Sequence, residues 1–442
     1  KDKKNKPSKE LPLGFVDRQE KELLVRDFII SNIKDIMIKY GFQYLETPSF
    51  EYSDSIGKFL PDKDRPDQGV FSFQDEKKWL SLRYDLTAPL ARYVAKNYLE
   101  IPKPFKRYQL GTVWRNEKPG PGRFREFLQF DADFVGTKSL QADAELCVLI
   151  SEILENCGLK KTEYIVKISS RKITEELFKK INIDDNDQKL ITLRALDKID
   201  RLGWDGVKQL LGDGRKDKSG DFTKGANLSS LNIGIIEKEL NKKSPDTKDL
   251  LEIFKIFKDY GFTNFEFDPS IIRGLEYYTG PIFEVNLKFD VKNSKGQVIQ
   301  FGSIGGGGRY DNLVNNFGNF DAPATGISIG LDRLVYALMQ KKEFKVKQSK
   351  PVVICVFDKN LMKEYINLQK ILRDSGISTE IYPAESKLKK QMEYANKIKA
   401  PAVILYGEDE IKLRKPTLRD LSSGNEKSIE IKELVNEIKK II

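Results

Sequence analysis

Two strand-like segments, residues 108–114 and 127–135, flank a loop rich in arginine, proline and glycine. Two such segments joined by a turn-forming loop predict an antiparallel β-hairpin. Alternation along the second strand places four side chains on one face, namely Phe127, Gln129, Asp131 and Asp133. An aromatic ring, an amide and two carboxylates in register favour a binding surface, although a strand with one solvated face would show the same pattern. The hairpin therefore predicts an antiparallel sheet with one polar face.

The rest of the 442-residue chain divides into stretches of different character. A single hydrophobic core stops growing at roughly 250–300 residues, so we expect two or three domains. Helical patterns dominate residues 171–262 and predict a module inserted into the domain that holds the hairpin. From residue 351 a β-α-β-α-β pattern predicts a small α/β domain with a largely parallel sheet. We expect these divisions: a flexible N-terminus 1–10, a main domain of 11–170 and 263–338, a helical insertion 171–262, a linker 339–350 and a C-terminal domain 351–442.

Local patterns predict further elements of the main domain. Apolar residues recur at helical spacing from Val25 to Tyr40, and residues 42–47 follow as a strand. Strand character returns over residues 271–285. Residues 283–289 and 297–301 predict a second hairpin.

Four consecutive glycines, residues 305–308, precede a strand of small residues at 324–329. That strand leads into a helix at 331–338. The glycines predict either a backbone that a ligand can approach closely or a flexible turn.

The absence of histidine limits the chemistry that the chain can perform. No histidine general base and no Ser-His-Asp triad is possible. Catalysis must rely on arginine, lysine, carboxylates, tyrosine and backbone groups, which suits nucleotidyl transfer, where positioning and charge neutralisation dominate.

Composition also bears on partners and compartment. The net charge of +10 permits nucleic-acid binding, but a lysine-rich genome would produce the same charge. Three widely spaced cysteines fit no metal or disulfide framework, and no apolar run approaches the roughly 20 residues that cross a bilayer. We expect a cytoplasmic protein with no membrane partner and no metal held by protein ligands.

Five segments, in the same order along the chain, resemble those of class II aminoacyl-tRNA synthetases. Residues 115–133 resemble motif 2 as histidyl-tRNA synthetases carry it, and Gly330-Leu-Asp-Arg333 resembles motif 3. Leu82-Arg83-Tyr-Asp85-Leu-Thr87 resembles the loop that meets the substrate amino group. Residues 272–280 and 305–311 are similar to two segments peculiar to the histidyl-tRNA synthetase family. The resemblance implies an α+β architecture: an antiparallel-sheet catalytic domain with a helical insertion, followed by an α/β anticodon-binding domain.

The family activates its amino acid with ATP, and the resemblance assigns residues to that nucleotide. Arginine forks pair bidentately with phosphate oxygens and keep their charge. The resemblance implies that Arg115 holds the α-phosphate and that Arg123 and Arg333 hold the distal phosphates. Phe127 would stack on adenine, and Glu117 would accept a hydrogen bond from its amino group.

Arg273 has the most direct implied role in catalysis, together with Arg115. The family places this arginine between the substrate carboxylate and the α-phosphate, where a fixed guanidinium stabilises the charge that builds in the transition state. A surface ion pair is the alternative. For the later transfer to tRNA, the base could be a phosphate oxygen of the adenylate or a nearby Glu or Gln, and the sequence does not choose between them.

Histidine itself sets the requirements for its pocket. Neutral imidazole has one donor and one acceptor near its pKa of about 6.5. The resemblance gives the matching acceptor and donor roles to Asp133 and Tyr278. A wrong amino acid leaves such groups unpaired, at a cost of up to roughly 10⁴–10⁵ in specificity, so no editing domain is required. The other implied histidine-binding residues are Tyr277 and Gln129 around the ring, Asp85 and Thr87 at the ammonium group, and Arg273 at the carboxylate.

Some positions depart from the pattern of many bacterial relatives. Asp85 and Asp133 stand where those relatives carry Glu, so the charge is kept. Lys118 and Gly120 stand where they carry Arg and Gln, in the loop that meets the acceptor end of the tRNA. Most histidine tRNAs carry an extra 5′ guanosine there, and losing the amide removes a base-reading group. We therefore expect an enzyme that does not depend on this guanosine.

The resemblance also implies the partners: L-histidine, ATP accompanied by Mg²⁺, tRNA(His), and a second copy of the chain. The homodimer would be built on motif 1, which the predicted helix up to Tyr40 and the strand 42–47 before Pro48 resemble. One alternative is the non-catalytic regulatory subunit of ATP phosphoribosyltransferase, which resembles these synthetases. Such proteins generally lack the C-terminal module and lose catalytic residues, whereas residues 351–442, Arg115, Arg273 and Arg333 are all present. A protein that senses tRNA without charging it is the other alternative.

Overall fold

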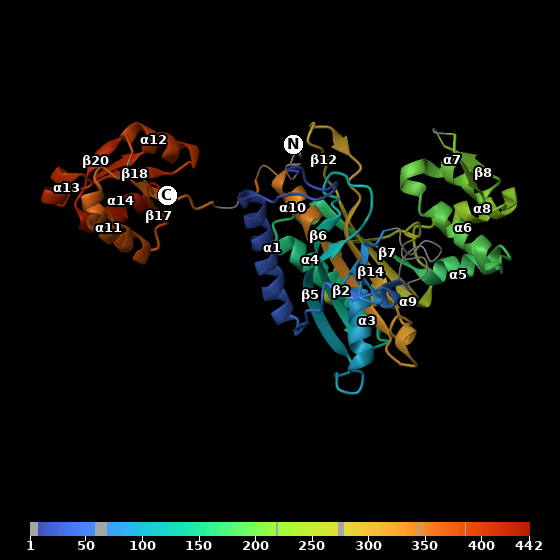
Figure 1. The fold of residues 1–442 in the computed structure, drawn as a ribbon. Helices are drawn as coiled ribbons and strands as arrows, with labels where there is room; N and C mark the ends of the chain where they lie inside the picture. The colour runs from blue at the N-terminus through green and yellow to red at the C-terminus, as the bar shows by residue number, and fades with distance from the viewer. Residues whose placement is uncertain are drawn as a thin grey trace, which may run out of the picture. The chain divides into compact units, whose positions relative to one another are not determined.

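The computed structural model describes residues 8–57, 69–217, 220–272, 278–341, 343–345, 348–384 and 386–442. The chain divides into two compact units, Lys1–Lys345 and Val346–Ile442, each considered by itself (Figure 1). In the described ranges, no helix combines the length and the apolar character needed to span a membrane.

An eight-stranded sheet organises the first unit. Its strands run in the order β1-β5-β6-β15-β14-β11-β7-β10, and only the pairs β1/β5 and β7/β10 are parallel. The predicted hairpin is confirmed, because β5 (Phe105–Trp114) pairs with β6 (Glu126–Val135) along its whole length. The other strands are β1 (Gln43–Tyr44), β15 (Ala324–Gly330), β14 (Ser303–Arg309), β11 (Pro281–Leu287), β7 (Tyr164–Ser170) and β10 (Phe265–Phe267).

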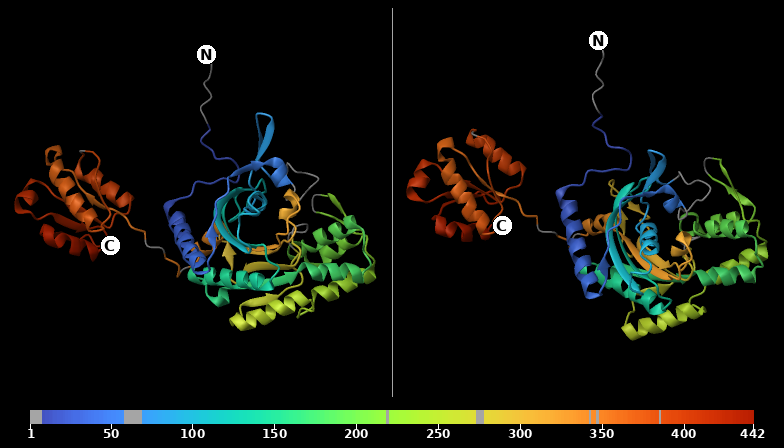
Figure 2. Two further views of the ribbon diagram at one scale, coloured as in Figure 1. Left: turned by 90° about the horizontal axis from the view of Figure 1, so that it is seen from below. Right: turned by 60° about the horizontal axis from the view of Figure 1, so that its bottom comes forward.

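Helices cover the two faces of the sheet differently. On one face, α4 (Leu140–Asn156) packs against α9 (Lys248–Tyr260), and α1 (Glu20–Lys39) packs against α4 and α10 (Leu331–Met339). The sheet curls around α3 (Thr87–Lys96), which lies on the concave face (Figure 2). Apolar residues of α3 pack there against Phe105, Val135 and Ala324. The polar residues of β6 lie farther along this same face.

The predicted first helix and first strand are both present, but the strand is short. α1 ends at Lys39, and Gly41 follows with a φ of 72°, a conformation that favours glycine. Only Gln43–Tyr44 of the predicted strand 42–47 pairs, at the parallel edge of the sheet. The last bond of this ladder runs from the Leu45 amide to the Tyr108 carbonyl, and Pro48 soon after has no amide to extend it.

The four glycines lie inside the central strand β14, so their interpretation as a flexible turn is wrong. A Cβ on Gly307 would overlap the carbonyl oxygen of Gly326 on β15, and a Cβ on Gly305 would lie 2.5 Å from that of Ser328. On the other face, a Cβ on Gly308 would lie 2.9 Å from the ring of Tyr278. Glycine is required because neighbouring backbone and a tyrosine ring occupy the space of a side chain.

Two predictions for the segment 271–301 are wrong. The strand begins at Pro281 rather than at residue 271, and residues 273–277 lie outside the described residues. β11 pairs with β7 and β14, so it does not form a hairpin with residues 297–301. The hairpin in this region is shorter, β12 (Val291–Lys292) with β13 (Val298–Ile299). Ile282, Phe283 and Val285 are buried, and such a strand gains more from two central neighbours than from a local turn.

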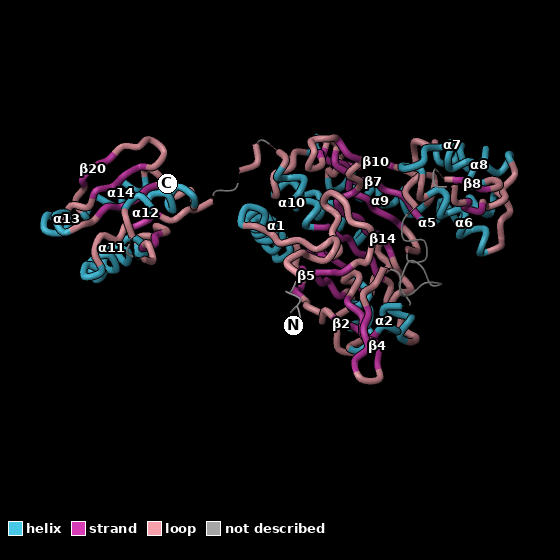
Figure 3. Tube along the Cα trace, turned by 45° about the horizontal axis from the view of Figure 1, so that its top comes forward, coloured by secondary structure: helices cyan, strands magenta, loops and turns pink. Residues whose placement is uncertain are grey.

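Smaller modules surround the sheet. A three-stranded sheet of β2 (Phe50–Tyr52), β4 (Lys78–Leu82) and β3 (Ser72–Asp75) lies beside α2 (Ser53–Gly57) (Figure 3). The predicted helical stretch has its own hydrophobic core, which includes Leu177, Leu193, Leu211 and Ile236. Its elements are α5 (Arg171–Lys180), α6 (Asn186–Leu196), α7 (Ile199–Leu211), the hairpin β8 (Gly214–Lys216) and β9 (Phe222–Lys224), and α8 (Ser230–Leu240). The bounds of the insertion at 171 and 262 stay a prediction.

The second unit contains the predicted β-α-β-α-β order and an extension. Strands β17, β16 and β18 are parallel, and the antiparallel β19 and β20 complete a five-stranded sheet. The sequence analysis missed the last two strands, which are short and polar. The elements are β16 (Val352–Ile354), α11 (Met362–Asp374), β17 (Thr379–Ile381), α12 (Leu388–Lys397), β18 (Ala402–Leu405), α13 (Glu408–Leu413), β19 (Thr417–Asp420), β20 (Glu426–Ser428) and α14 (Ile431–Lys439).

Candidate active site

Strand register assembles polar side chains into rows on the concave face. Asp133 of β6 stands between Arg107 of β5 and Gly326 of β15. Asp131 stands between Gln109 and Ser328 in the next row. Because directly paired residues share a face of the sheet, the polar face predicted from β6 extends across three strands.

A buried ion pair occupies one row. Arg107 Nη2 lies 2.9 Å from Asp133 Oδ2, and the two side chains are 0% and 3% exposed. This contact is an ion pair without hydrogen-bond alignment, so Oδ2 can still accept a hydrogen bond. The Tyr310 hydroxyl donates to the other oxygen, Asp133 Oδ1. Arg107 Nη2 also donates to the carbonyl of Leu86, at 3.1 Å. Asp133 is thus held rigidly with one oxygen able to receive a ligand.

Glycines make room for the two side chains predicted to contact imidazole. A Cβ on Gly326 would overlap Asp133 Oδ1, and a Cβ on Gly308 would meet the ring of Tyr278. Gly308 and Gly326 are directly paired on β14 and β15. The fold therefore packs Asp133 against β15 and Tyr278 against the neighbouring strand β14. The predicted residues Arg273 and Tyr277 lie outside the described residues.

The start of α3 meets the row of Asp131. The Thr87 hydroxyl donates to Asp131 Oδ2 at 3.2 Å, and Asp85 Oδ1 accepts from the Ala88 amide at 2.9 Å in the first turn of α3. Gln129 Oε1 and Asp131 Oδ1 are buried, and neither has a hydrogen-bond partner in the described part of the chain. The predicted residues Asp85, Thr87 and Gln129 therefore lie together, around a carboxylate that the prediction left without a role.

This row is electrostatically negative. Burial, reinforced by the neighbouring Asp133, raises the pKa of Asp131 to about 7 against the opposing effect of Arg107. Burial also raises the pKa of Asp133 and of Asp85. Three carboxylates thus surround one fully buried arginine, an arrangement that favours a cationic ligand.

Arg115 lies between two aromatic rings at the edge of this face. Its guanidinium carbon is 4.4 Å from the ring centre of Tyr84 and 5.2 Å from that of Phe127. Arg115 Nε donates to the Tyr84 carbonyl at 3.2 Å, and the Tyr84 hydroxyl donates to Glu117 Oε1 at 2.7 Å. Tyr84 therefore holds two of the predicted ATP ligands, and Phe127 lies beside them.

The other predicted phosphate ligands lie around Phe301. Arg333, in the first turn of α10, donates to the Phe301 carbonyl, and its guanidinium carbon lies 4.3 Å from the centre of the Phe301 ring. A Cβ on Gly122, in the loop between β5 and β6, would lie 3.1 Å from the same ring. In that loop, Arg123 is 61% exposed and its Nη2 lies 3.6 Å from Glu117 Oε2.

The loop itself is a small hairpin. The amides of Gly120 and Arg123 each donate to the carbonyl of the other, at 2.9 and 2.8 Å. Lys118 and Gly120, the predicted tRNA contacts, are both exposed. The loop therefore presents them to solvent at the edge of the site.

A further buried carboxylate, Asp332, connects the elements on the nucleotide side of the site. Its Oδ1 receives Arg18 Nε at 3.1 Å and Arg26 Nη2 at 2.8 Å, and its Oδ2 receives the Leu128 amide at 2.6 Å. Leu128 follows Phe127, and Asp332 precedes Arg333 in the chain. One side chain thus anchors the backbone of both predicted nucleotide ligands to α1 and to the segment before it.

Sequence patterns did not reveal three parts of the site, namely Arg107, Tyr84 and Asp332. Arg107 could have been predicted from the register of the hairpin, which places it opposite Asp133. Tyr84 lies inside a segment already singled out. The partners of Asp332 are separated from it by 204 to 314 residues, and no local pattern signals such contacts.

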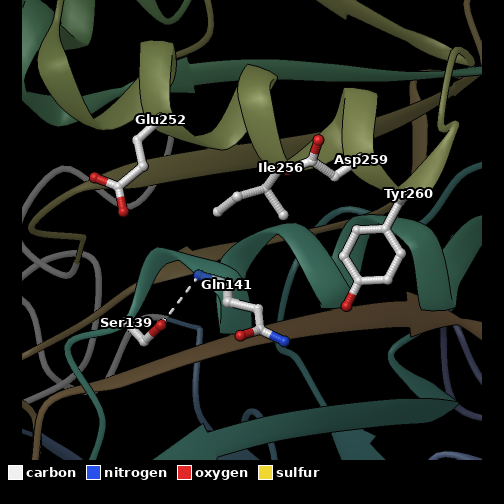
Figure 4. Close-up of a pocket in the computed structure, with 6 residues that line it drawn as sticks. All are labelled: Ser139, Gln141, Glu252, Ile256, Asp259 and Tyr260. Carbon is white, nitrogen blue, oxygen red and sulfur yellow. Dashed lines mark hydrogen bonds between the residues drawn. The ribbon is translucent and has the colours of Figure 1, made fainter.

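A separate hollow of about 450 Å³ lies away from this site. Ser139 and Gln141 at the start of α4 line it, together with four residues of α9 (Figure 4). These two helices cover the opposite face of the sheet, so the hollow contributes nothing to the polar rows.

The antiparallel sheet with its polar concave face and the separate C-terminal module define the class of protein, a class II aminoacyl-tRNA synthetase. The family model described as histidyl-tRNA synthetase matches residues 14–334, and the model described as anticodon binding domain matches residues 351–441. The chain belongs to the histidyl-tRNA synthetase family.

Individual relatives agree over nearly the whole length. The chain is 45% identical to a histidine–tRNA ligase of Bartonella quintana, covering 98% of this chain and 92% of the relative. It is 44% identical to the histidine–tRNA ligase of Brucella ovis, covering 98% of this chain and 92% of that relative. Among solved structures, the histidyl-tRNA synthetase of Nostoc superposes with a TM-score of 0.75 at 26% identity, covering 99% of this chain and all of that one.

Proposed function

We propose that this chain is a histidine–tRNA ligase. It activates L-histidine with ATP to form histidyl-adenylate and diphosphate, and it then transfers histidine to the 3′ end of tRNA(His), releasing AMP. The observation that carries this function is a buried, acceptor-rich pocket beside Arg115 and Phe127, on one sheet face of a chain in this family. The separate C-terminal module supports tRNA binding, because it matches the anticodon-binding family.

In the activation step, a carboxylate oxygen of histidine attacks the α-phosphorus as the bond to diphosphate breaks. Arg115 and Arg273 neutralise the negative charge that gathers on the α-phosphate oxygens. Phe127 stacks on adenine and Glu117 accepts from its amino group, while Arg123 and Arg333 hold the distal phosphates. The placement of Arg115 between Tyr84 and Phe127 supports these roles.

The histidine side chain lies between Asp133 and Tyr278, with Tyr277 closing the pocket. Asp133 accepts from one ring nitrogen, and Tyr278 donates to the other. The rigid support of Asp133 by Arg107 and Tyr310 suits this role, because fixed groups discriminate best. Asp85 and Thr87 lie at the ammonium group, and Arg273 also pairs with the carboxylate. Gln129 was predicted beside the ring, but its position next to Asp131 on the same face of β6 supports a contact to the ammonium group instead.

Mg²⁺ enters this scheme as the companion of ATP. Within the described residues no three His, Cys, Asp or Glu side chains gather into a metal site. Mg²⁺ commonly keeps water ligands and takes its other ligands from substrate phosphates and one or two carboxylates. We therefore assign it to the nucleotide complex, where it neutralises phosphate charge.

Transfer to tRNA uses the loop between β5 and β6. Lys118 and Gly120 are exposed at its tip and meet the acceptor end. Gly120 offers no side chain to read an extra 5′ guanosine, which supports charging that is independent of that nucleotide. The base for this step is either an adenylate phosphate oxygen or a nearby Glu or Gln.

The enzyme works as a homodimer in the cytoplasm, where its free, buried cysteines stay reduced. α1 and the edge strand β1 form the proposed interface. Ile38 of α1 is 74% exposed and Tyr44 of β1 is 46% exposed, and an open sheet edge invites pairing. Sedimentation velocity of the unaltered chain and of Ile38→Asp tests this assembly. The proposed dimer is contradicted if the unaltered chain sediments as a monomer at micromolar concentration.

The function is tested by histidine-dependent exchange of labelled diphosphate into ATP, followed by aminoacylation of tRNA(His). Arg273→Ala should lower exchange by at least 100-fold, because it removes a charge that acts in the transition state. Absence of exchange in the unaltered chain would exclude the enzyme. Equal exchange with another amino acid would exclude the histidine assignment.

A further inference from the structure

Asp131 belongs to the polar face, but none of the proposed contacts to histidine or ATP involves it. It is 1% exposed, and it lies between Gln129 and Asp133 on the same face of β6. The Thr87 hydroxyl donates to its Oδ2, and Ser328 stands opposite it on β15, yet Oδ1 has no partner in the described part of the chain. Gln129 Oε1, two residues away on the same strand face, is buried and equally unpartnered there, whereas the unbonded oxygen of Asp133 lies 2.9 Å from Arg107.

Two buried acceptors without donors are costly in an empty protein. Leaving one such group unsatisfied costs about 1–3 kcal/mol, and more for a charged group. Native structures keep few of them, and a functional site is one common reason. Gln129 and Asp131 lie together on the concave face beside Thr87, so a ligand there that brings its own donors would satisfy both oxygens.

The charges around Asp131 select a cationic donor. Asp85 and Asp133 face it with negative charge, and Arg107 and Arg83 face it with positive charge. Arg83 donates to the carbonyls of Thr47 and Thr112. Arg107 is engaged by Asp133 and by the Leu86 carbonyl, and in the described residues only its Nε is buried without a partner. A compact ligand cation with several N–H donors would complete this row, and a primary ammonium group has that chemistry.

Asp85 already has a task in the first turn of α3. Asp85 Oδ1 accepts from the Ala88 amide and thereby supports the start of α3. Asp131 is joined to that helix only through Thr87, which uses its Oδ2 and leaves Oδ1 open. Thr87 thus links the helix start to the open carboxylate oxygen.

We propose that Asp131 is a specificity-determining residue: its Oδ1, together with Gln129 Oε1, receives the α-ammonium group of histidine. The inference rests on the proposed function and on the placement of the ammonium group near Thr87. It adds a second carboxylate to that subsite and gives Asp85 mainly the task of holding α3.

Two analogues of histidine isolate this contact. L-Histidinol keeps the imidazole and the ammonium group, whereas imidazolepropionate keeps the imidazole and the carboxylate but has no ammonium group. Their binding is measured by calorimetry with the unaltered full chain, Asp131→Asn and Asp131→Ser. Asp249→Asn is the matched control, because Asp249 is a buried carboxylate of α9 that receives the Ser170 hydroxyl at 2.6 Å, outside the site.

Both Asp131 variants should weaken histidinol binding by roughly 10- to 100-fold, as expected for a charge-assisted hydrogen bond. Their affinity for imidazolepropionate should change by less than about threefold, and the control should bind both analogues like the unaltered chain. Equal losses for the two analogues would overturn the inference, since they indicate a contact to the ring or a general distortion. Unchanged histidinol binding would overturn it too. Failure of the unaltered chain to bind histidinol and to exchange diphosphate would instead overturn the proposed function.

Discussion

Replacing Asp131 with asparagine should stabilise the unliganded protein at alkaline pH. The carboxylate is buried beside Asp133 and Asp85, and its pKa is raised from 3.8 to about 7. A raised carboxyl pKa means that the folded state binds this proton more tightly than the unfolded state does. Ionisation of the group therefore costs stability, and the cost grows as the pH rises from about 4 to about 7. Asparagine has nearly the same shape and no charge to desolvate.

The size of the effect follows from the shift. Moving a carboxyl pKa from 3.8 to about 7 corresponds to as much as about 4 kcal/mol above pH 7. Asp131 and Asp133 titrate together, so this penalty belongs to the pair. For a domain of 150–250 residues, 1 kcal/mol moves the melting temperature by roughly 2–4 °C. We expect Asp131→Asn to melt several degrees higher at pH 8 and to gain much less at pH 4.5, where the carboxyl of the folded protein is still protonated.

Tryptophan fluorescence isolates the relevant unit. All three tryptophans, Trp79, Trp114 and Trp204, lie in the first unit, so their signal follows its unfolding without the C-terminal unit. Thermal melts at pH 4.5 and pH 8 compare the unaltered chain, Asp131→Asn and the control Asp249→Asn. Asp133→Asn provides the contrast, because it leaves Arg107 buried without its ion-pair partner and should cost about 3–5 kcal/mol.

Two results would refute this reasoning. Asp131→Asn could melt below the unaltered chain at pH 8, or its gain could be the same at both pH values. Either outcome would mean that the carboxylate is not penalised in the folded state. The expected result also implies that, without substrate, the unaltered protein is less stable than the variant because it buries a negative charge that the substrate would neutralise.

Three further predictions concern the sheet, the nucleotide side and the tRNA. Gly307→Ala should lower the free energy of unfolding by about 3 kcal/mol or more, because its Cβ would overlap the carbonyl of Gly326. The control Gly234→Ala, on an exposed part of α8 with open space around it, should raise that free energy by about 0.5–1 kcal/mol. Urea unfolding measures both, and a Gly307→Ala variant as stable as the unaltered chain would contradict the strand packing. Asp332→Asn should raise KM for ATP by roughly ten- to a hundredfold, since a displaced Leu128 and α10 move Phe127 and Arg333. KM for histidine should stay nearly unchanged, so equal changes in both constants would indicate a general loss of structure. Transcripts of tRNA(His) with and without the extra 5′ guanosine should be charged at similar rates, and a 100-fold loss without it, about 3 kcal/mol, would show that the nucleotide is read.

Local patterns in the chain determined much of this protein. Alternation in β6 and the turn-forming loop before it predicted the hairpin, because both are properties of neighbouring residues. Ordered motifs identified the family and the residues to examine, and the repeated β-α order predicted the second unit. Strand partners were beyond such patterns: β11 has the alternation of a hairpin strand but pairs with β7 and β14.

Tertiary structure alone decided which of the polar residues are open to a ligand. The sequence places Asp131 and Asp133 two residues apart on one face, with nothing to distinguish them. In the fold, Arg107 and Tyr310 hold Asp133, while Thr87 holds only one oxygen of Asp131. The difference arises because the contacts of a buried charge come from strands and helices far apart in the chain, and these contacts determine its hydrogen-bonding capacity and its pKa.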